Sequence, residues 1–271
     1  MTACEYNWTS LGGLKHTGFV SLKKLVSDAL LGSRFEQIAR KAYTKLVPTR
    51  NNRYDWQLTK LMARVLKPDS NCVDIGCYRG AVLGEMIRLC PLGRHFAFEP
   101  IPQNFRYLAD TFKAASVFQL ALSDHSGRTS FQHVIGRTAR SGLLRVDYPD
   151  KNQAVEQIEV EVARLDDVIP RGTHVDFIKV DVEGAEVSVL RGGRELIKDC
   201  RPVIVFEHGW KRAALYDSKP EQIHELLTLD CGLHLSLMAR YLAGQDPFKS
   251  DEFVRHVYDD RDFCFVAYAA R

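Results

Sequence analysis

Short apolar segments alternate with amphipathic segments from residue 71 to the C-terminus, and this alternation constrains the fold more than any other feature of the sequence. The apolar segments have the length of buried strands, and the segments between them repeat apolar side chains at helical spacing. Strands joined in this way form a parallel sheet that is covered by helices on both faces. Strands are predicted at 71–76, 94–100, 117–124, 177–184 and 201–209, and helices at 80–90, 103–115, 185–196 and 220–230.

Two segments depart from the alternation. Residues 127–134 and 157–165 read as antiparallel strands with a polar loop between them, so they interrupt the parallel pattern. The final apolar strand, 262–270, has no crossover helix just ahead of it. We therefore expect this last strand to lie antiparallel, at or near an edge of the sheet.

The N-terminal part of the chain is predicted to be helical and separate from the sheet. Residues 22–47 and 55–66 carry apolar side chains at helical spacing and precede the first strand. We therefore divide the chain into an N-terminal helical extension, 1–67, and an α/β domain, 68–271. The apolar stripe of the extension needs a partner surface, which predicts either a cap over the substrate site or a contact in a homo-oligomer.

The extension is strongly basic. Residues 23–67 hold eleven Lys and Arg against three Asp and Glu, a net charge of +8. Such a segment can attract nucleic acid or an anionic surface, but the solvent-facing sides of amphipathic helices have the same composition, and we favour that interpretation.

Cysteine usage and hydropathy indicate the compartment. The chain has seven cysteines and no Cys-x-x-Cys pair, which is typical of a reducing compartment. No segment has the apolar length of a signal peptide or of a membrane span. We therefore expect a cytoplasmic protein with no membrane span and no disulfide framework.

The loop after the first predicted strand, VDIGCYRG, is the first candidate for ligand binding, because ligands bind at the carboxyl ends of the strands in open parallel sheets. Asp74, Gly76 and Gly80 are its distinctive residues. A dinucleotide fingerprint has three glycines whose loop faces a pyrophosphate. Here one glycine is missing and an acid comes first, which suits a ligand with an amine and hydroxyls, such as S-adenosylmethionine. Gly76 and Gly80 would let the backbone approach that ligand closely.

Two further acids follow neighbouring strands. Glu99 ends the second predicted strand, where an acid can accept hydrogen bonds from both ribose hydroxyls of a cofactor. Asp124 ends the third and can accept a hydrogen bond from an adenine amino group. Together with the loop, these residues predict a nucleoside-containing cofactor.

A second group of polar residues follows the fourth and fifth predicted strands. Asp181 ends an apolar central strand, where burial of an acid is costly without a function. His208 could remove a proton from a substrate hydroxyl, with Asp181 orienting the substrate. Alternatively, Asp181, Glu207 and His208 could hold a divalent cation, although we predict no metal. The neighbouring acids predicted to contact substrate are Glu183, Glu186 and Glu207.

These motifs, in their order and spacing, resemble the FkbM family of S-adenosylmethionine-dependent methyltransferases. The resemblance runs from about residue 70 to the C-terminus. The motifs that carry it are VDIGCYRG, AFEPIPQNF, LALSD, LDDVI, FIKVDVEGAEVSVLRGG and VIVFEHG.

The resemblance implies a class I methyltransferase fold, with a Rossmann-like, seven-stranded, mostly parallel sheet whose last strand is antiparallel. It implies O-methylation of a hydroxyl on a sugar or a secondary metabolite. By position, the cofactor would be held by Asp74, Gly76, Gly80, Glu99 and Asp124, and Asp181 would face the methyl-transfer site. The family usually has Asn in the first loop, where this chain has Cys77-Tyr78-Arg79.

Two other functions remain as alternatives. An NAD-dependent reductase of the short-chain type would have a Tyr-x-x-x-Lys pair, and no tyrosine in the sequence is followed by Lys four residues later. A non-catalytic nucleic-acid-binding protein is supported only by the basic segment 23–67. A nitrogen methyltransferase would typically have an Asn/Asp-Pro-Pro-Tyr turn after the fourth strand, where Asp-Val-Glu-Gly stands here, so oxygen is the favoured acceptor.

Overall fold

The computed structural model of the chain describes residues 49–135, 141–143 and 154–270. The chain divides into two compact units, and the larger one, which includes Gln57–Arg271, holds nearly all of the described residues. The helices predicted within 22–47 lie outside the described residues. The helix predicted at 55–66 is present as α3, Arg50–Val65. No helix among the described residues is long and apolar enough to cross a membrane.

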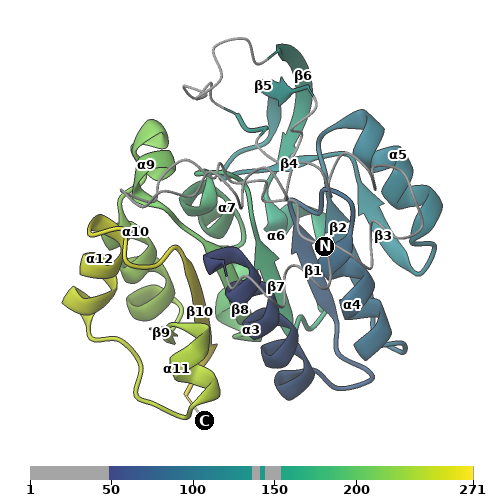
Figure 1. The fold of residues 1–271 in the computed structure, drawn as a ribbon. Helices are drawn as coiled ribbons and strands as arrows, with labels where there is room; N and C mark the ends of the chain where they lie inside the picture. Colours follow the sequence, from purple (N-terminus) through teal and green to yellow (C-terminus); the bar gives the residue numbers. More distant parts are fainter. Residues whose placement is uncertain (1–48, 136–140, 144–153, 271) are drawn as a thin grey trace, which may run out of the picture. The chain divides into compact units, whose positions relative to one another are not determined.

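A seven-stranded sheet forms the centre of the larger unit, in the order β3-β2-β1-β7-β8-β10-β9 (Figure 1). The strands β3, β2, β1, β7 and β8 pair in parallel, whereas β10 is antiparallel to both of its neighbours. This arrangement is the α/β fold of class I methyltransferases. The strands are β1 (Cys72–Ile75), β2 (His95–Phe98), β3 (Ala115–Phe118), β7 (Phe177–Val180), β8 (Val203–Glu207), β9 (Leu233–Ser236) and β10 (Cys264–Ala269).

The last strand confirms one prediction and corrects two details. It is antiparallel and second from the edge. The edge strand itself, β9, was not predicted, because a four-residue segment containing His234 and Ser236 lacks a clear apolar pattern. A helix, α12, does precede the last strand, although its polar first turn hides it in the sequence.

Helices cover the sheet on both faces. On one face, α4 and α5 pack Leu83 and Leu108 against β2 and β3. On the other face, α7, α8, α10 and α12 pack apolar side chains against residues of the central strands. The helices are α4 (Ala81–Leu89), α5 (Pro102–Thr111), α6 (Leu165–Val168), α7 (Glu186–Gly192), α8 (Arg194–Cys200), α9 (Trp210–Ala213), α10 (Pro220–His224), α11 (Met238–Leu242) and α12 (Ser250–Tyr258), with a 3₁₀ turn at Ala214–Tyr216 and a π-helical segment at Glu225–Asp230.

Three further strands pair with one another in a second, smaller sheet. Its order is β4-β6-β5, with β4 at Ala121–Leu122, β5 at Gly127–Val134 and β6 at Val155–Ala163. The antiparallel pairing of β5 with β6 confirms the predicted interruption. The predicted strand 117–124 is in fact two strands: β3 ends at Phe118 in the large sheet, and β4 pairs with β6 in the small one.

Gly192, in the LRGG sequence at the end of α7, allows a close contact with the residue that follows β4. A Cβ atom on Gly192 would lie 1.9 Å from the backbone oxygen of Ser123, directly after β4. No atom can occupy that position while both backbones stay in place. Gly192 therefore allows the segment that carries β4 to cross closely over α7.

We predict that Gly192→Ala lowers the free energy of unfolding by about 3 kcal/mol or more, because one of two backbones must move. The matched control is Gly209→Ala, whose Cβ would meet only Cβ of Phe263 at an ordinary 3.8 Å. Because Gly209 is the N-cap of α9, where Ala is less favourable than Gly, the control should cost about 1 kcal/mol, clearly less than Gly192→Ala. Urea unfolding of both variants tests this, and equal stability losses would contradict it.

Candidate functional site

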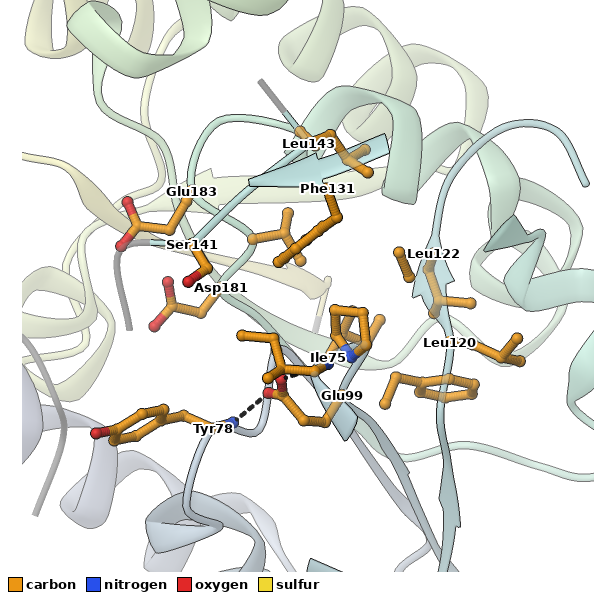
Figure 2. Close-up of a pocket in the computed structure, with 17 residues that line it drawn as sticks. Ile75, Tyr78, Glu99, Leu120, Leu122, Phe131, Ser141, Leu143, Asp181 and Glu183 are labelled. Atoms are coloured by element: carbon orange, nitrogen blue, oxygen red, sulfur yellow. Dashed lines mark hydrogen bonds between the residues drawn. The ribbon is translucent and has the colours of Figure 1, made fainter. Parts of the chain in front are cut away.

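A pocket of about 590 Å³, open to solvent, lies at the carboxyl ends of β1, β2 and β7. In Figure 2, Asp181, Glu183 and Ser141 gather on one side of it, and Leu120 and Leu122 stand on the opposite side. The small sheet contributes Phe131 to the wall. The lining residues are Ile75, Gly76, Tyr78, Phe98–Ile101, Leu120–Leu122, Phe131, Ser141, Leu143, Asp181–Glu183 and Ala185.

Gly76 and Gly80, the two glycines of the first loop, are each required for a different structural reason. Gly76 has φ +81°, and a Cβ there would lie 1.9 Å from the carbonyl oxygen of Asp181, so the loop passes directly against the end of β7. Gly80 has φ +74°, and its Cβ position is filled by the side chains of Phe112 and Leu108. Gly76 lines the pocket as predicted. The close approach at Gly80 is to these side chains, at α5 and the residue after it, rather than to a ligand.

Several N–H groups of this loop are bonded within the protein. Gly76 and Cys77 donate to the carbonyl oxygen of Phe98, at 3.0 and 3.2 Å. Tyr78 donates to Oε2 of Glu99 at 2.9 Å. A pyrophosphate site needs such N–H groups pointing at the ligand. These three N–H groups are therefore not available to a pyrophosphate.

Glu99 lies in the pocket wall after β2, where it was predicted. Its carboxylate accepts hydrogen bonds from the backbone of Tyr78 and Ile101 and, at 3.4 Å, from the side chain of Asn104. Burial raises the pKa of Glu99 to about 7, against the lowering effect of these three donors. Asn104 was not predicted, because a single Asn at the start of a helix has no distinctive sequence signal.

Asp74 is buried inside β1 rather than exposed in the loop. It is 2% exposed, and its Oδ2 atom has no hydrogen-bond partner in the described structure. Burial raises the pKa of Asp74 to about 6, although the nearby ammonium group of Lys179 acts in the opposite direction. Asp74 is not among the residues that line the pocket, so it would act on a ligand there through its charge rather than by direct contact.

Asp124 lies outside the pocket. The predicted position assumed that residues 117–124 form one strand of the large sheet, but Asp124 follows β4 of the small sheet. Its carboxylate lies 3.0 Å from Nδ1 of His125 and is 41% exposed. The backbone segment just before it, Leu120–Leu122, is the part that reaches the pocket.

Asp181 follows β7 and lines the pocket, as predicted. Its Oδ2 lies 3.5 Å from Nζ of Lys179, a buried lysine in the middle of the same strand. Glu207 at the end of β8 completes this charged group, and burial raises its pKa well above the usual value, with Asp181 adding to the effect. Glu207 is not among the lining residues. Lys179 was overlooked, although a lysine within the apolar strand FIKV was a visible signal.

The remaining predicted residues divide into one that lines the pocket and two that do not. Glu183 lines it and pairs with Arg212 of α9 at 3.0 Å. Glu186 and His208 are 1% and 0% exposed and bond to each other at 3.2 Å. His208 is therefore not a histidine at the rim, and a buried side chain in this position does not reach a substrate hydroxyl.

The described residues do not group as metal ligands. Within them, no set of three or more His, Cys, Asp or Glu side chains is arranged to hold a metal ion. The alternative cation site at Asp181, Glu207 and His208 is therefore not assembled in this structure.

Comparison with known proteins identifies the domain. The family model described as "Methyltransferase FkbM domain" matches residues 74–234, more than half of the chain. The 2-O-methyltransferase NoeI of Sinorhizobium fredii (strain NBRC 101917 / NGR234) is 29% identical over 196 residues, covering 66% of this chain and 78% of NoeI. Methyltransferase 1 of Beauveria bassiana (strain ARSEF 2860) is 32% identical over 156 residues, covering 46% of this chain and 58% of that protein.

One solved structure that is similar to this chain is also an FkbM methyltransferase by its description. The methyltransferase FkbM from Methylobacillus flagellatus KT aligns with a TM-score of 0.46 and 20% identity, over 75% of this chain and 44% of that chain. The chain thus spans less than half of that solved protein and 58% of the Beauveria relative.

We predict that the stability of Glu99→Gln, relative to the unchanged protein, rises with pH. The folded pKa of about 7 exceeds the unfolded value of about 4.3, so ionisation of Glu99 costs stability between these values. From pH 5 to pH 8 the difference in unfolding free energy should move in favour of the variant by about 2 kcal/mol. Urea unfolding at both pH values measures it, with the exposed Glu159→Gln as control. A difference that does not change with pH would contradict the prediction.

Proposed function

Because the chain belongs to the FkbM family of S-adenosylmethionine-dependent methyltransferases, we propose that it methylates a hydroxyl oxygen of a small molecule, such as a sugar or a secondary metabolite. The observation that carries the proposal is the lining of the pocket. It presents carboxylates at two sides, while the N–H groups of Gly76, Cys77 and Tyr78 in its first loop are bonded within the protein. Such a lining suits a ligand with ammonium, sulfonium and hydroxyl groups and disfavours one with phosphates.

The cofactor side of the proposed site is built from three elements. Glu99 would accept hydrogen bonds from the ribose hydroxyls chiefly at Oε2, which accepts the N–H of Tyr78 and has a second acceptor site, whereas Oε1 already accepts from Ile101 and Asn104. Asp74 would supply negative charge to the ammonium group. The apolar segment Leu120–Leu122 would lie against the adenine ring, where Asp124 was predicted to contact the adenine amino group.

The acceptor side would be formed by Asp181 and Glu183. S-adenosylmethionine, when bound, supplies a methyl group on a positively charged sulfur. Asp181 would accept a hydrogen bond from the substrate hydroxyl, hold its oxygen in line with that methyl group, and take the proton as the oxygen is methylated. Lys179, 3.5 Å away, would hold the Asp181 carboxylate in place. His208 has no direct part in this scheme because it is fully buried.

Two observations favour oxygen over nitrogen as the acceptor atom. The turn after β7 is Asp-Val-Glu-Gly and offers carboxylates, which pair naturally with hydroxyl donors. The similar protein NoeI is a 2-O-methyltransferase. A panel of monosaccharides, glycosides, phenols and amines, incubated with S-adenosylmethionine and analysed for a methylated product by mass spectrometry and NMR, identifies the atom. Methylation of amines alone would overturn the proposed O-specificity.

We predict that the protein binds S-adenosylhomocysteine in calorimetry and binds neither NAD nor NADP. Glu99→Ala should weaken the binding of S-adenosylhomocysteine by about 1.5–3 kcal/mol, the scale of a pair of charge-assisted hydrogen bonds. Asp124→Ala is the control, since Asp124 lies outside the pocket and should leave the affinity unchanged. An unchanged affinity in Glu99→Ala would remove Glu99 from the cofactor site.

We predict that Asp181→Asn slows methyl transfer at least about 100-fold, because the amide cannot take the proton of the acceptor hydroxyl. The affinity for S-adenosylhomocysteine should change much less, since the carboxylate acts on the acceptor side. The rate is measured as S-adenosylhomocysteine released with an acceptor from the panel, in the presence and absence of EDTA. A loss of the wild-type rate in EDTA that Mg²⁺ restores would replace this assignment with a metal site.

A further inference from the structure

His208 and Glu186 form a buried pair beside the pocket that the proposed chemistry does not use. Nδ1 of His208 lies 3.2 Å from Oε2 of Glu186, and both side chains are at most 2% exposed. A carboxylate only accepts hydrogen bonds, so Nδ1 carries the hydrogen of this bond. Burying a carboxylate is costly unless its oxygens are bonded, and the bond from His208 offsets part of this cost for Glu186. We therefore ask what the buried pair does.

The second oxygen of Glu186 shows what that role involves. Oε1 accepts a hydrogen bond from the backbone N–H of Gly184 at 2.8 Å. Gly184 has φ +115°, and the residue before it, Glu183, has φ +59°. A non-glycine residue in the left-handed region costs on the order of 1 kcal/mol and persists only where the surroundings hold it. Glu186 is one of the groups that hold this turn.

The turn forms part of the pocket wall. Asp181 and Glu183 both line the pocket, on either side of Val182. The turn is also confined from outside, because a Cβ on Gly184 would meet the ring of Tyr216 at 2.8 Å. A small rotation at Gly184 would therefore move the two carboxylates that face the ligand.

We propose that His208 and Glu186 are positioning residues that fix the Glu183–Gly184 turn, and through it the carboxylates of Asp181 and Glu183, in the geometry that the ligand requires. This inference rests on the proposed function, since it assigns the turn to the methyl-transfer site. His208 orients Glu186, Glu186 binds the Gly184 N–H, and that bond sets the backbone. The link from His208 to the reaction is mechanical, through a hydrogen bond to a carboxylate, and involves no proton exchange with substrate.

Side-chain geometry offers a matched pair of variants at His208. The amide nitrogen of Asn is attached to Cγ, as Nδ1 is in His, so His208→Asn keeps a donor close to Glu186. Leu has a similar branched shape and no donor, so His208→Leu removes only the bond. The control for general loosening of β8 is Ile204→Val, a buried position on the same strand. It should lower the stability slightly, by the loss of one buried methyl group, without touching the turn.

The first readout is amide hydrogen exchange of a peptide that covers residues 181–186, measured without ligand. His208→Leu should exchange at least tenfold faster there than the unchanged protein, whereas His208→Asn and Ile204→Val should stay within about threefold. The second readout is the affinity for S-adenosylhomocysteine of the folded variants. His208→Leu should bind about fivefold or more weakly, and the other two should bind like the unchanged protein.

Several results would overturn the positioning role. Equal exchange and affinity in His208→Leu and His208→Asn would show that the donor is irrelevant. Faster exchange with unchanged affinity would show that the turn does not matter to the ligand. Should His208→Leu fail to fold, Glu186→Asp tests the same link, because the shortened carboxylate cannot reach both partners, and it must give the same local increase in exchange. If the unchanged protein binds no S-adenosylhomocysteine, the proposed function fails, while the exchange data still judge the hydrogen-bonded turn.

Discussion

The pocket depends on one close backbone contact, between the loop after β1 and the end of β7. These strands pair in parallel along their whole length, and the carbonyl oxygen of Asp181 occupies the space that a side chain on Gly76 would need. The strand order reverses here, because β2 and β3 extend from one side of β1 while β7 and β8 extend from the other. Such a reversal opens a crevice at the carboxyl ends of the strands. Gly76 lets the loop after β1 contact the end of β7 in this crevice. The loop and the acidic turn after β7 therefore line the same pocket.

This arrangement places several carboxylates where water cannot fully solvate them. Burial raises the pKa values of Asp74, Glu99 and Glu207, so each of these groups is less stable in its charged form than it would be in water. The buried ammonium group of Lys179 offsets part of this cost. Burial alone would lower the pKa of Lys179, but Asp181, Glu207 and Asp74 raise it overall. A ligand that carries positive charge would offset more. The unfavourable burial of these carboxylates is thus a source of binding free energy for a cationic ligand.

The sequence predicted the fold better than it predicted the site, for physical reasons. Five strands and their helices were visible because buried strands are continuously apolar and helices repeat every three to four residues. The segment 117–124 is divided because β3 pairs with β2 and β4 pairs with β6, and no local pattern encodes this choice of partners. Asp124 was misplaced for that reason. His208 was expected at the rim because it follows a strand, whereas the carboxylate of Glu186, on the neighbouring helix, draws it into the interior.

Backbone strain and buried glutamates occur together at both sides of the pocket. Of the five non-glycine residues with positive φ in the described structure, Tyr78 and Glu183 line the pocket. At each of these turns a backbone N–H, that of Tyr78 or that of Gly184, donates to a buried glutamate, Glu99 or Glu186. Positions with positive φ are usually occupied by Asn or Gly, which adopt this conformation at little cost. This chain has Tyr and Glu instead, so the hydrogen bonds to Glu99 and Glu186 must stabilise what the backbone alone would not.

The two glutamates differ in one respect that fits their proposed roles. Glu99 lines the pocket, where the proposed cofactor would lie, whereas Glu186 is enclosed and does not line it.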